Sequence, residues 1–416
     1  MKFISTRKSS PSVSASVAII NGLAPDGGLY VPESIPSLNL NNAPSYNDYP
    51  ALAHFVLSPY FEGDVLEKDL YDICKEAFTF PIPLHYHNKN EAVLELFHGP
   101  TAAFKDFGAR FLAIVMERLL TISKNTLTIL VATSGDTGGA VAAAFHKRQN
   151  IEVKVLFPKG RVSARQERQL TCYEENITSF AVDGSFDDCQ KMVKEAFMDS
   201  ALSHHHLTSA NSINLGRLLP QMVYAFSSSL EMFEKTGEKS TLIIPSGNVG
   251  NSCASFYAKE MGAPIKEIIL SVNNNTTIVD YLKSGTYSGR ASIATLANAM
   301  DVGDPSNMER LFHHSSFLHN MKAFSVSDEE IKRSIKEVYE KHSYIVCPHT
   351  ATGEKVRKEL HLNSPTIVYA TAHPAKFETI VEPIIQKKIE IPPLLNELLE
   401  KEQHFTSITA DYHLLF

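Results

Sequence analysis

Lys105 stands in a setting that an ordinary surface lysine does not need. It lies in ELFHGPTAAFKDFGARF (95–111), between Phe104 and Phe107, after a Pro-Thr turn and before a stretch with helical periodicity. An amine attacks a carbonyl only when it is neutral, and apolar neighbours lower the pKa of a lysine by disfavouring its charge. The segment therefore suits a nucleophilic lysine, although a solvated lysine at a helix start is by itself the more common explanation.

Two glycine loops, each placed between a β-branched run and a run of helix formers, have the composition of anion sites. The loop sequences are Ser134-Gly135-Asp136-Thr137-Gly138-Gly139 and Ser246-Gly247-Asn248-Val249-Gly250-Asn251. Glycine lets a ligand approach the backbone, and the first N–H groups of a helix lack backbone partners. The second loop matches neither nucleotide-binding glycine motif, which favours a compact monophosphate. For the first loop, a simple capped helix packed on the sheet is an equal alternative to a carboxylate or phosphate site.

A third polar cluster lies in TSANSINLGRLLPQ (208–221), where Asn211, Ser212 and Arg217 fall within seven residues. Arginine grips phosphate or carboxylate with two parallel hydrogen bonds. When this segment is taken alone, a helix cap beside a solvated arginine is the more common explanation. Combined with the other segments, however, a lysine and a monophosphate cradle match pyridoxal 5'-phosphate, an aldehyde on a phosphorylated ring.

The elements that must position these residues follow an alternating order from about residue 91. Predicted strands cover 126–133, 151–157, 177–182, 241–245, 267–272 and 366–371. Helical periodicity covers the stretch after Lys105, 187–199 and 216–235, and a further helix begins after Ser327, which forms a capping box with Glu330. Alternating strands and helices predict an α/β fold with mostly parallel sheets, whose ligands lie at the carboxyl ends of the strands.

Composition limits the other possible functions. The chain has 416 residues, enough for two or three domains, and a net charge of −7, which disfavours nucleic-acid binding. Its five cysteines are scattered, which is typical of reduced thiols, and no run of about 18 apolar residues predicts a membrane span. The consecutive histidines 204–206 do not complete a zinc set. We therefore expect a cytoplasmic protein without a nucleic-acid, membrane or metal partner.

Seven ordered motifs resemble the threonine synthase family, which belongs to the fold type II pyridoxal-phosphate enzymes. Besides the Lys105 segment they are NGLAPDGGLYVPESIP, TSGDTGGAV, ANSINLGR, PSGNVGN, CPHTATG and ATAHPAKF. The resemblance covers essentially the whole chain and favours the functional interpretation of Lys105. It implies an α/β fold like that of the tryptophan synthase β subunit, with two α/β domains. The expected divisions are an N-terminal region (1–85), a large cofactor-binding domain (86–125 and 221–416) and a small domain (126–220).

The resemblance also implies roles for single residues. Lys105 would carry the cofactor as a Schiff base and then move protons. Backbone N–H groups of the loop 246–251 (Ser246, Gly247, Asn248, Val249, Gly250 and Asn251) would bind the cofactor phosphate, and the Thr371 hydroxyl would bond its pyridine nitrogen. Ser134, Asp136 and Thr137 would surround the substrate carboxylate and the ring oxygen. Asn211, Ser212 and Arg217 would bind the phosphate of the substrate. His349 and His373 lie in family motifs and are left between a site role and a structural one.

The implied reaction converts O-phospho-L-homoserine and water to L-threonine and phosphate, in a monomer or small homo-oligomer. Three anion sites are needed, for the cofactor phosphate and for the two anionic groups of the substrate, and the sequence offers three candidates. Two alternatives are another fold type II enzyme, such as a serine or threonine dehydratase, and an inactive homologue that binds a phosphorylated ligand. Neither a dehydratase nor a cysteine synthase needs a cation for a γ-phosphate, so Arg217 separates these possibilities.

Overall fold

Thirteen strands form three sheets in the computed structural model, which describes residues 1–319 and 321–416. The strands are β1 (Phe3–Ser5), β2 (Tyr30–Pro32), β3 (Leu84–Asn88), β4 (Glu91–Glu95), β5 (Leu127–Ala132), β6 (Ile151–Pro158), β7 (Ile177–Asp183), β8 (Leu207–Ser209), β9 (Ser240–Pro245), β10 (Ile265–Val272), β11 (Lys322–Ser325), β12 (Thr366–Ala370) and β13 (Thr406–Thr409). A six-stranded sheet has the order β11-β10-β9-β12-β4-β3, a five-stranded sheet the order β13-β7-β6-β5-β8, and β1 pairs with β2. Every neighbouring pair in the two large sheets is parallel except β3 with β4, so the expected parallel-rich α/β fold is confirmed.

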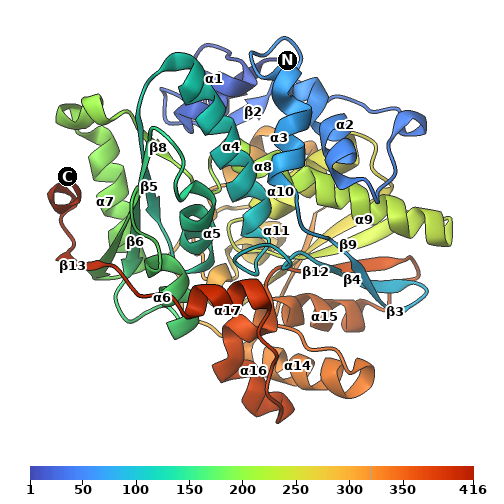
Figure 1. Cartoon of the computed structure of the whole chain (residues 1–416). Coiled ribbons are helices and arrows are strands. Elements are labelled where there is room, and N and C mark those ends of the chain that lie inside the picture. The colour runs from blue at the N-terminus through green and yellow to red at the C-terminus, as the bar shows by residue number, and fades with distance from the viewer. Residues whose placement is uncertain (320) are drawn as a thin grey trace.

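Helices cover the sheets on both sides. They are α1 (Ala15–Asn21), α2 (Tyr49–Phe61), α3 (Leu70–Ala77), α4 (Lys105–Ser123), α5 (Asp136–Phe145), α6 (Ala164–Thr171), α7 (Phe186–Met198), α8 (Leu215–Leu218), α9 (Gln221–Thr236), α10 (Gly250–Glu260), α11 (Thr277–Ser284), α12 (Met308–His313), α13 (Ser316–His319), α14 (Asp328–His342), α15 (Pro348–Leu360), α16 (Glu378–Ile385) and α17 (Pro393–Leu399). Figure 1 shows the five-stranded sheet on the left, with α7 outside it, and the six-stranded sheet on the right, with α9 above it and α15 below it. No helix in the described part of the chain is long and apolar enough to cross a membrane.

The strands predicted from the sequence are present within one or two residues of the expected bounds. β5, β9 and β12 are buried along their whole length, which explains why they read as continuous apolar runs rather than as alternating ones. The helix expected over 216–235 is divided, because α8 ends at Leu218 and α9 begins after Pro220, which has no N–H to donate. The capping box between Ser327 and Glu330 is confirmed at the start of α14.

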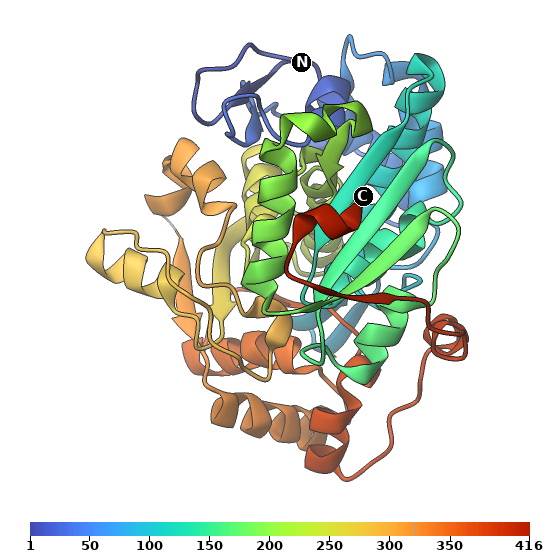
Figure 2. The ribbon, with the colours of Figure 1, turned by 90° about the vertical axis from the view of Figure 1, so that its left-hand side faces the viewer.

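The end of the chain returns to the five-stranded sheet. Strand β13 lies parallel to β7, with Thr406 opposite Phe180 and Thr409 opposite Asp183. Figure 2 shows the C-terminal segment against the five-stranded sheet, where the Leu415 carbonyl oxygen accepts a hydrogen bond from Lys154 of β6. Residues 406–409 therefore belong to the five-stranded sheet, whose other strands lie between residues 127 and 209.

Candidate active site

The Lys105 turn is fixed by its pairing with the segment that follows β12. The Phe104 N–H donates to the Thr371 carbonyl oxygen (2.9 Å), and the His373 N–H donates to the Ala102 carbonyl oxygen (3.0 Å). Within the turn, the buried Asp106 carboxylate accepts hydrogen bonds from the N–H and the hydroxyl of Thr101 (2.9 and 2.7 Å). Lys105 therefore begins α4 directly beside Thr371, and both residues line one pocket.

The electrostatic setting of Lys105 destabilises its charged form. Burial and the nearby Arg217 cation lower the pKa of Lys105 to about 8, against the opposing effect of the Asp136 carboxylate. The Lys105 Nζ lies 4.7 Å from the centroid of the Phe104 ring. Phe107 was the other expected apolar neighbour, but it is fully buried and packs its ring against Phe80 and Tyr224.

The second glycine loop forms the opposite wall of the pocket, at the carboxyl end of β9. Val249 has a left-handed backbone (φ 48°) and precedes α10, whose first turn receives no side-chain cap. The first N–H groups of α10 are thus available to an anion. Gly247 lies so close to Met300 that an added Cβ would come within 2.8 Å of its backbone. The Asn251 Nδ2 is buried without a hydrogen-bond partner among the described residues, although its Oδ1 accepts from the Tyr224 hydroxyl at 2.8 Å.

Asp136, at the start of α5, is held by a fully buried ion pair. Its Oδ1 lies 2.8 Å from the Nζ of Lys376, which also donates to the Thr101 carbonyl oxygen (2.9 Å). Burial works against the charge of Asp136, but Lys376 outweighs it and lowers the pKa of the carboxyl to about 2. The Gln166 amide adds a hydrogen bond to the same carboxylate at 3.1 Å. Asp136 is therefore a fixed anion near Lys105.

This ion pair leads to a prediction about stability. Because a buried charge without its partner is costly, we expect Lys376→Met to lower the free energy of unfolding by about 3–5 kcal/mol. Adding Asp136→Asn to that variant removes the isolated charge and should restore part of the loss. Urea denaturation of both variants measures the effect, and a double variant no more stable than Lys376→Met would contradict it.

Arg217 reaches the pocket from α8, although its side chain is almost fully buried. Its Nη1 donates to the Ala210 carbonyl oxygen (2.7 Å), and its Nε has no hydrogen-bond partner in the described residues. Burial lowers the pKa of Arg217 to about 10, against the opposing effect of Asp106. Ser212 lines the same pocket, where its hydroxyl accepts a hydrogen bond from the Asn248 amide. The pocket is thus lined by an arginine that has an N–H group not bonded by any described residue.

The structure brings together most of the residues that the sequence predicted. The pocket is lined by Lys105, Asp136, Ser212, Arg217, Thr371 and the whole loop 246–251. Three predicted residues do not line it: Ser134, Thr137 and Asn211. The Asn211 side chain instead donates to the Ala132 carbonyl oxygen at 3.2 Å, which ties the 210–217 segment to the end of β5.

Several residues of the site were not predicted. Gln221, Ala299 and Met300 line the pocket, and Lys376 lies behind Asp136. Arg310 donates to the carbonyl oxygens of Ser212 and Ile213 and so supports the predicted polar cluster. Lys376 lies in the motif ATAHPAKF, which was the only signal that could have indicated it.

The two histidines that the sequence left open have different positions. His349 lines the pocket, and its Nε2 accepts a hydrogen bond from the Ala299 N–H at 3.1 Å. Burial lowers the pKa of His349 to about 4, which keeps the ring neutral and free to accept that bond. His373 is not among the pocket residues, and its Nδ1 accepts from the Ala375 N–H at 3.1 Å, capping a short turn.

Comparison with known proteins identifies the family. Residues 86–368 match the family model described as pyridoxal-phosphate dependent enzyme, and residues 2–78 and 350–415 match the N-terminal and C-terminal models of threonine synthase. The chain is 40% identical over 391 residues to threonine synthase of Haemophilus influenzae, covering 92% of this chain and 91% of that protein. The chain belongs to the threonine synthase family. Its expected use of pyridoxal phosphate and its lyase class are thereby confirmed.

Solved structures agree with this family assignment. Threonine synthase of Escherichia coli superposes with a TM-score of 0.92 at 34% identity, covering 100% of this chain and 98% of that one. The pyridoxal-phosphate-bound threonine synthase of Brucella melitensis gives 0.91 at 35% identity, with the same two coverages. Maize serine racemase, at 17% identity and a TM-score of 0.54 over 78% of this chain, shows the fold type II architecture alone. These matches therefore favour the threonine synthase family over another fold type II enzyme such as a serine or threonine dehydratase.

The described residues fit the cofactor of this family. A partly buried lysine, an uncapped helix start, the unpartnered Asn251 amide and the Thr371 hydroxyl face one pocket. An amine, phosphate-binding N–H donors and a neutral partner for a ring nitrogen are the groups that pyridoxal phosphate requires.

Proposed function

We propose that the chain converts O-phospho-L-homoserine and water to L-threonine and inorganic phosphate. The observation that carries this proposal is a second cation, Arg217, in the same pocket as Lys105. The helix start at Gly250 offers N–H groups for the cofactor phosphate, so Arg217 remains for another anion. A substrate with its own phosphate would use it, whereas a serine or threonine substrate would leave a buried cation unpaired.

We assign the following residues to ligand binding. The N–H groups of the loop 246–251 and the Asn251 amide would hold the cofactor phosphate, and Thr371 would bond the ring nitrogen. Ser212 and Arg217 would bind the substrate phosphate, with Asn211 fixing the segment that carries them. Ser134 and Thr137 would contact the substrate carboxylate after the five-stranded sheet closes toward the loop 246–251. Asp136 would lie beside the ring oxygen.

When bound, pyridoxal phosphate supplies an aldehyde that captures an amine and a ring that withdraws electrons from the neighbouring carbon. Lys105 would first hold the cofactor and then, as a neutral amine, take a proton from Cα of the substrate and another from Cβ. Arg217 would hold the phosphate as it leaves Cγ and would stabilise its growing charge. Water would add its hydroxyl at Cβ and give its remaining proton to the released phosphate, and Lys105 would return the two protons that it removed, one to Cγ and one to Cα.

The direct test is to mix the cofactor-loaded protein with O-phospho-L-homoserine and to assay both products. We expect threonine and phosphate in equal amounts, and no threonine from L-homoserine, which lacks the leaving group. Release of phosphate with a 2-oxo acid in place of threonine would overturn the proposal and indicate an eliminating enzyme.

The lowered pKa of Lys105 predicts a specific pH dependence in the cofactor-free protein. Only the neutral amine reacts with acetic anhydride, so labelling of Lys105 should rise with pH, reach its midpoint near pH 8 and level off above it. Lys332 is an internal control, because Glu329 raises its pKa and its labelling should still be rising at pH 10. Mass spectrometry of the labelled peptides gives both curves, and coincident curves would contradict the prediction.

The remaining assignments are also proposals. We propose that residues 1–85 form an N-terminal region, that 86–125 and most of 221–416 form the large domain, and that 126–220 together with β13 form the small one. The partner is a small molecule, and the chain acts as a monomer or small homo-oligomer. A cytoplasmic location is supported by the five cysteines, which are all free and buried.

A further inference from the structure

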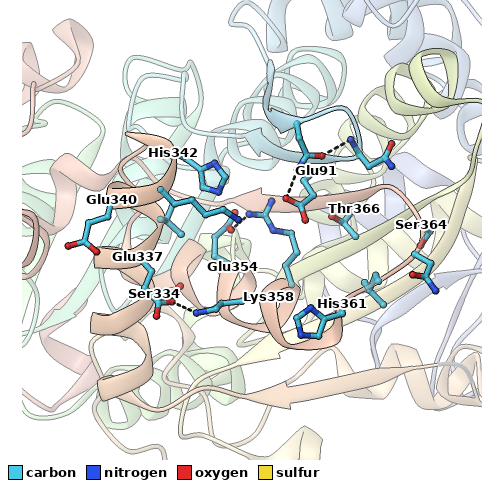
Figure 3. Close-up of a pocket in the computed structure, with 17 residues that line it drawn as sticks. Glu91, Ser334, Glu337, Glu340, His342, Glu354, Lys358, His361, Ser364 and Thr366 are labelled. Carbon is cyan, nitrogen blue, oxygen red and sulfur yellow. Dashed lines mark hydrogen bonds and ion pairs between the residues drawn. The ribbon is translucent and has the colours of Figure 1, made fainter.

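A second cavity, of about 990 Å³, lies at the end of the six-stranded sheet opposite Lys105. Thr366, which begins β12, lines this cavity, whereas Thr371, just after β12, lines the active site. The walls come from the β3–β4 turn, the end of α14, the second half of α15 and the loop 361–366. Figure 3 shows His342 and Glu91 along one side, Lys358 and His361 along the other, and Glu354 between them.

Three residues that line the cavity carry buried donor or acceptor atoms without a hydrogen-bond partner in the described chain. Arg357 pairs with Glu354 through Nη2 and Oε2, but no residue in the described chain bonds the Arg357 Nη1 or the Glu354 Oε1. The Glu354 Oε1 has only the His87 Nε2 at 3.5 Å. The Thr366 hydroxyl is likewise buried and unpartnered. Since unsatisfied buried groups are costly, a donor and an acceptor are expected to arrive together from a ligand.

The charged side chains around the cavity limit the kinds of molecule that it can bind. Positive side chains (Lys341, Arg357 and Lys358) and negative ones (Glu91, Glu337, Glu340 and Glu354) line it together. A simple anion such as phosphate would face four carboxylates, and a simple cation would face Arg357 and the two lysines. A molecule with one carboxylate and one ammonium group satisfies both kinds of site.

We propose that this cavity binds a free α-amino acid as a zwitterion. Its carboxylate accepts from the Arg357 Nη1, and its ammonium group donates to the Glu354 Oε1. Helix α15 then connects the two sites, because His349 near its start lines the active site while Glu354 and Arg357 line the cavity.

The test measures the melting temperature of the cofactor-loaded protein with each standard L-amino acid, with inorganic phosphate and with methylammonium. Binding to the native state alone raises the melting temperature. We expect at least one amino acid to raise it, while phosphate and methylammonium do not. Only shifts that leave the visible absorption of the cofactor unchanged are counted, because that absorption reports occupation of the active site.

Two variants locate the binding. Arg357→Met removes the buried donor, and Asn363→Trp fills the cavity from an exposed position in the loop 361–366 without changing the Glu354–Arg357 pair. Calorimetry should show at least tenfold weaker binding in both variants, and unchanged binding in Lys332→Ala, which lies on α14 outside the cavity. If Arg357→Met does not fold, Asn363→Trp decides alone. The proposal is overturned if no amino acid raises the melting temperature, if phosphate alone does, or if binding persists in Asn363→Trp.

Discussion

Replacement of Lys105 by alanine should lower kcat/KM by about 10⁴-fold or more. The variant loses the amine that would hold the cofactor and the base that would move both protons, and general acid–base catalysis alone contributes up to about 10⁴-fold. Lys105 is not part of the 2.8 Å contact between Asp136 and Lys376, so that pair and the pocket should stay intact in the variant. The measurement is the rate of threonine formation from O-phospho-L-homoserine at saturating cofactor.

A readout independent of turnover separates a catalytic role from a structural one. Borohydride reduction of the cofactor-loaded wild-type protein should add the cofactor mass to the peptide that contains Lys105. Lys105→Arg keeps the positive charge but not the nucleophilic amine, and it should show neither the added mass nor activity. Added mass on another lysine, or activity within tenfold of wild type in either variant, would show that Lys105 is not the cofactor lysine.

Replacement of Arg217 by alanine should lower kcat/KM for O-phospho-L-homoserine by about 30-fold or more, while the cofactor stays bound. Losing one partner of a buried, hydrogen-bonded charge pair costs at least about 2 kcal/mol, and each 1.36 kcal/mol corresponds to a factor of ten. Arg217 also donates to the Ala210 carbonyl oxygen, so the melting temperature must be followed alongside the kinetics.

The matched comparison for this variant uses two competitive inhibitors. Inorganic phosphate should lose affinity for Arg217→Ala, whereas L-homoserine, which has the same carbon skeleton without the phosphate, should inhibit both forms equally. Arg217→Lys keeps the positive charge but cannot donate two parallel hydrogen bonds. Its affinity for phosphate should therefore lie between that of the wild type and that of Arg217→Ala. Equal losses for phosphate and homoserine would assign Arg217 to the general structure of the pocket.

Much of the fold could be predicted from the sequence, because the central strands are short β-branched runs separated by clear helices. The strands that were not predicted include β1, β2, β3, β4, β8 and β11. β1, β2 and β8 have only three residues each, and β3, with the sequence LHYHN, is mostly polar and partly exposed. β13 could not be predicted either, since its four residues are mostly exposed and their partner in β7 is far away in the chain.

The sequence indicated pocket residues where a residue type suited to the chemistry stands at a boundary between a strand and a helix. Lys105 and the loop 246–251 combine a reactive or anion-binding composition with a clear strand-to-helix boundary, and they do meet in one pocket. Lys376 and Gln221 carry no such local signal, because their places in the site depend on how distant segments pack. Ser134 and Thr137 share a motif with Asp136, yet only Asp136 lines the pocket in this arrangement.

The parallel pairing of β13 with β7 also affects how the protein is made. The ribosome releases β7 long before it completes residues 406–409, and at about 5–20 residues per second the interval is on the order of ten seconds or more. During that time the edge of β7 is open, and an unpaired strand edge can pair with another chain. Strand β13 therefore closes this edge of the sheet late in synthesis, so a chain that ends before residue 406 would carry a nearly complete catalytic pocket together with a strand edge prone to aggregation.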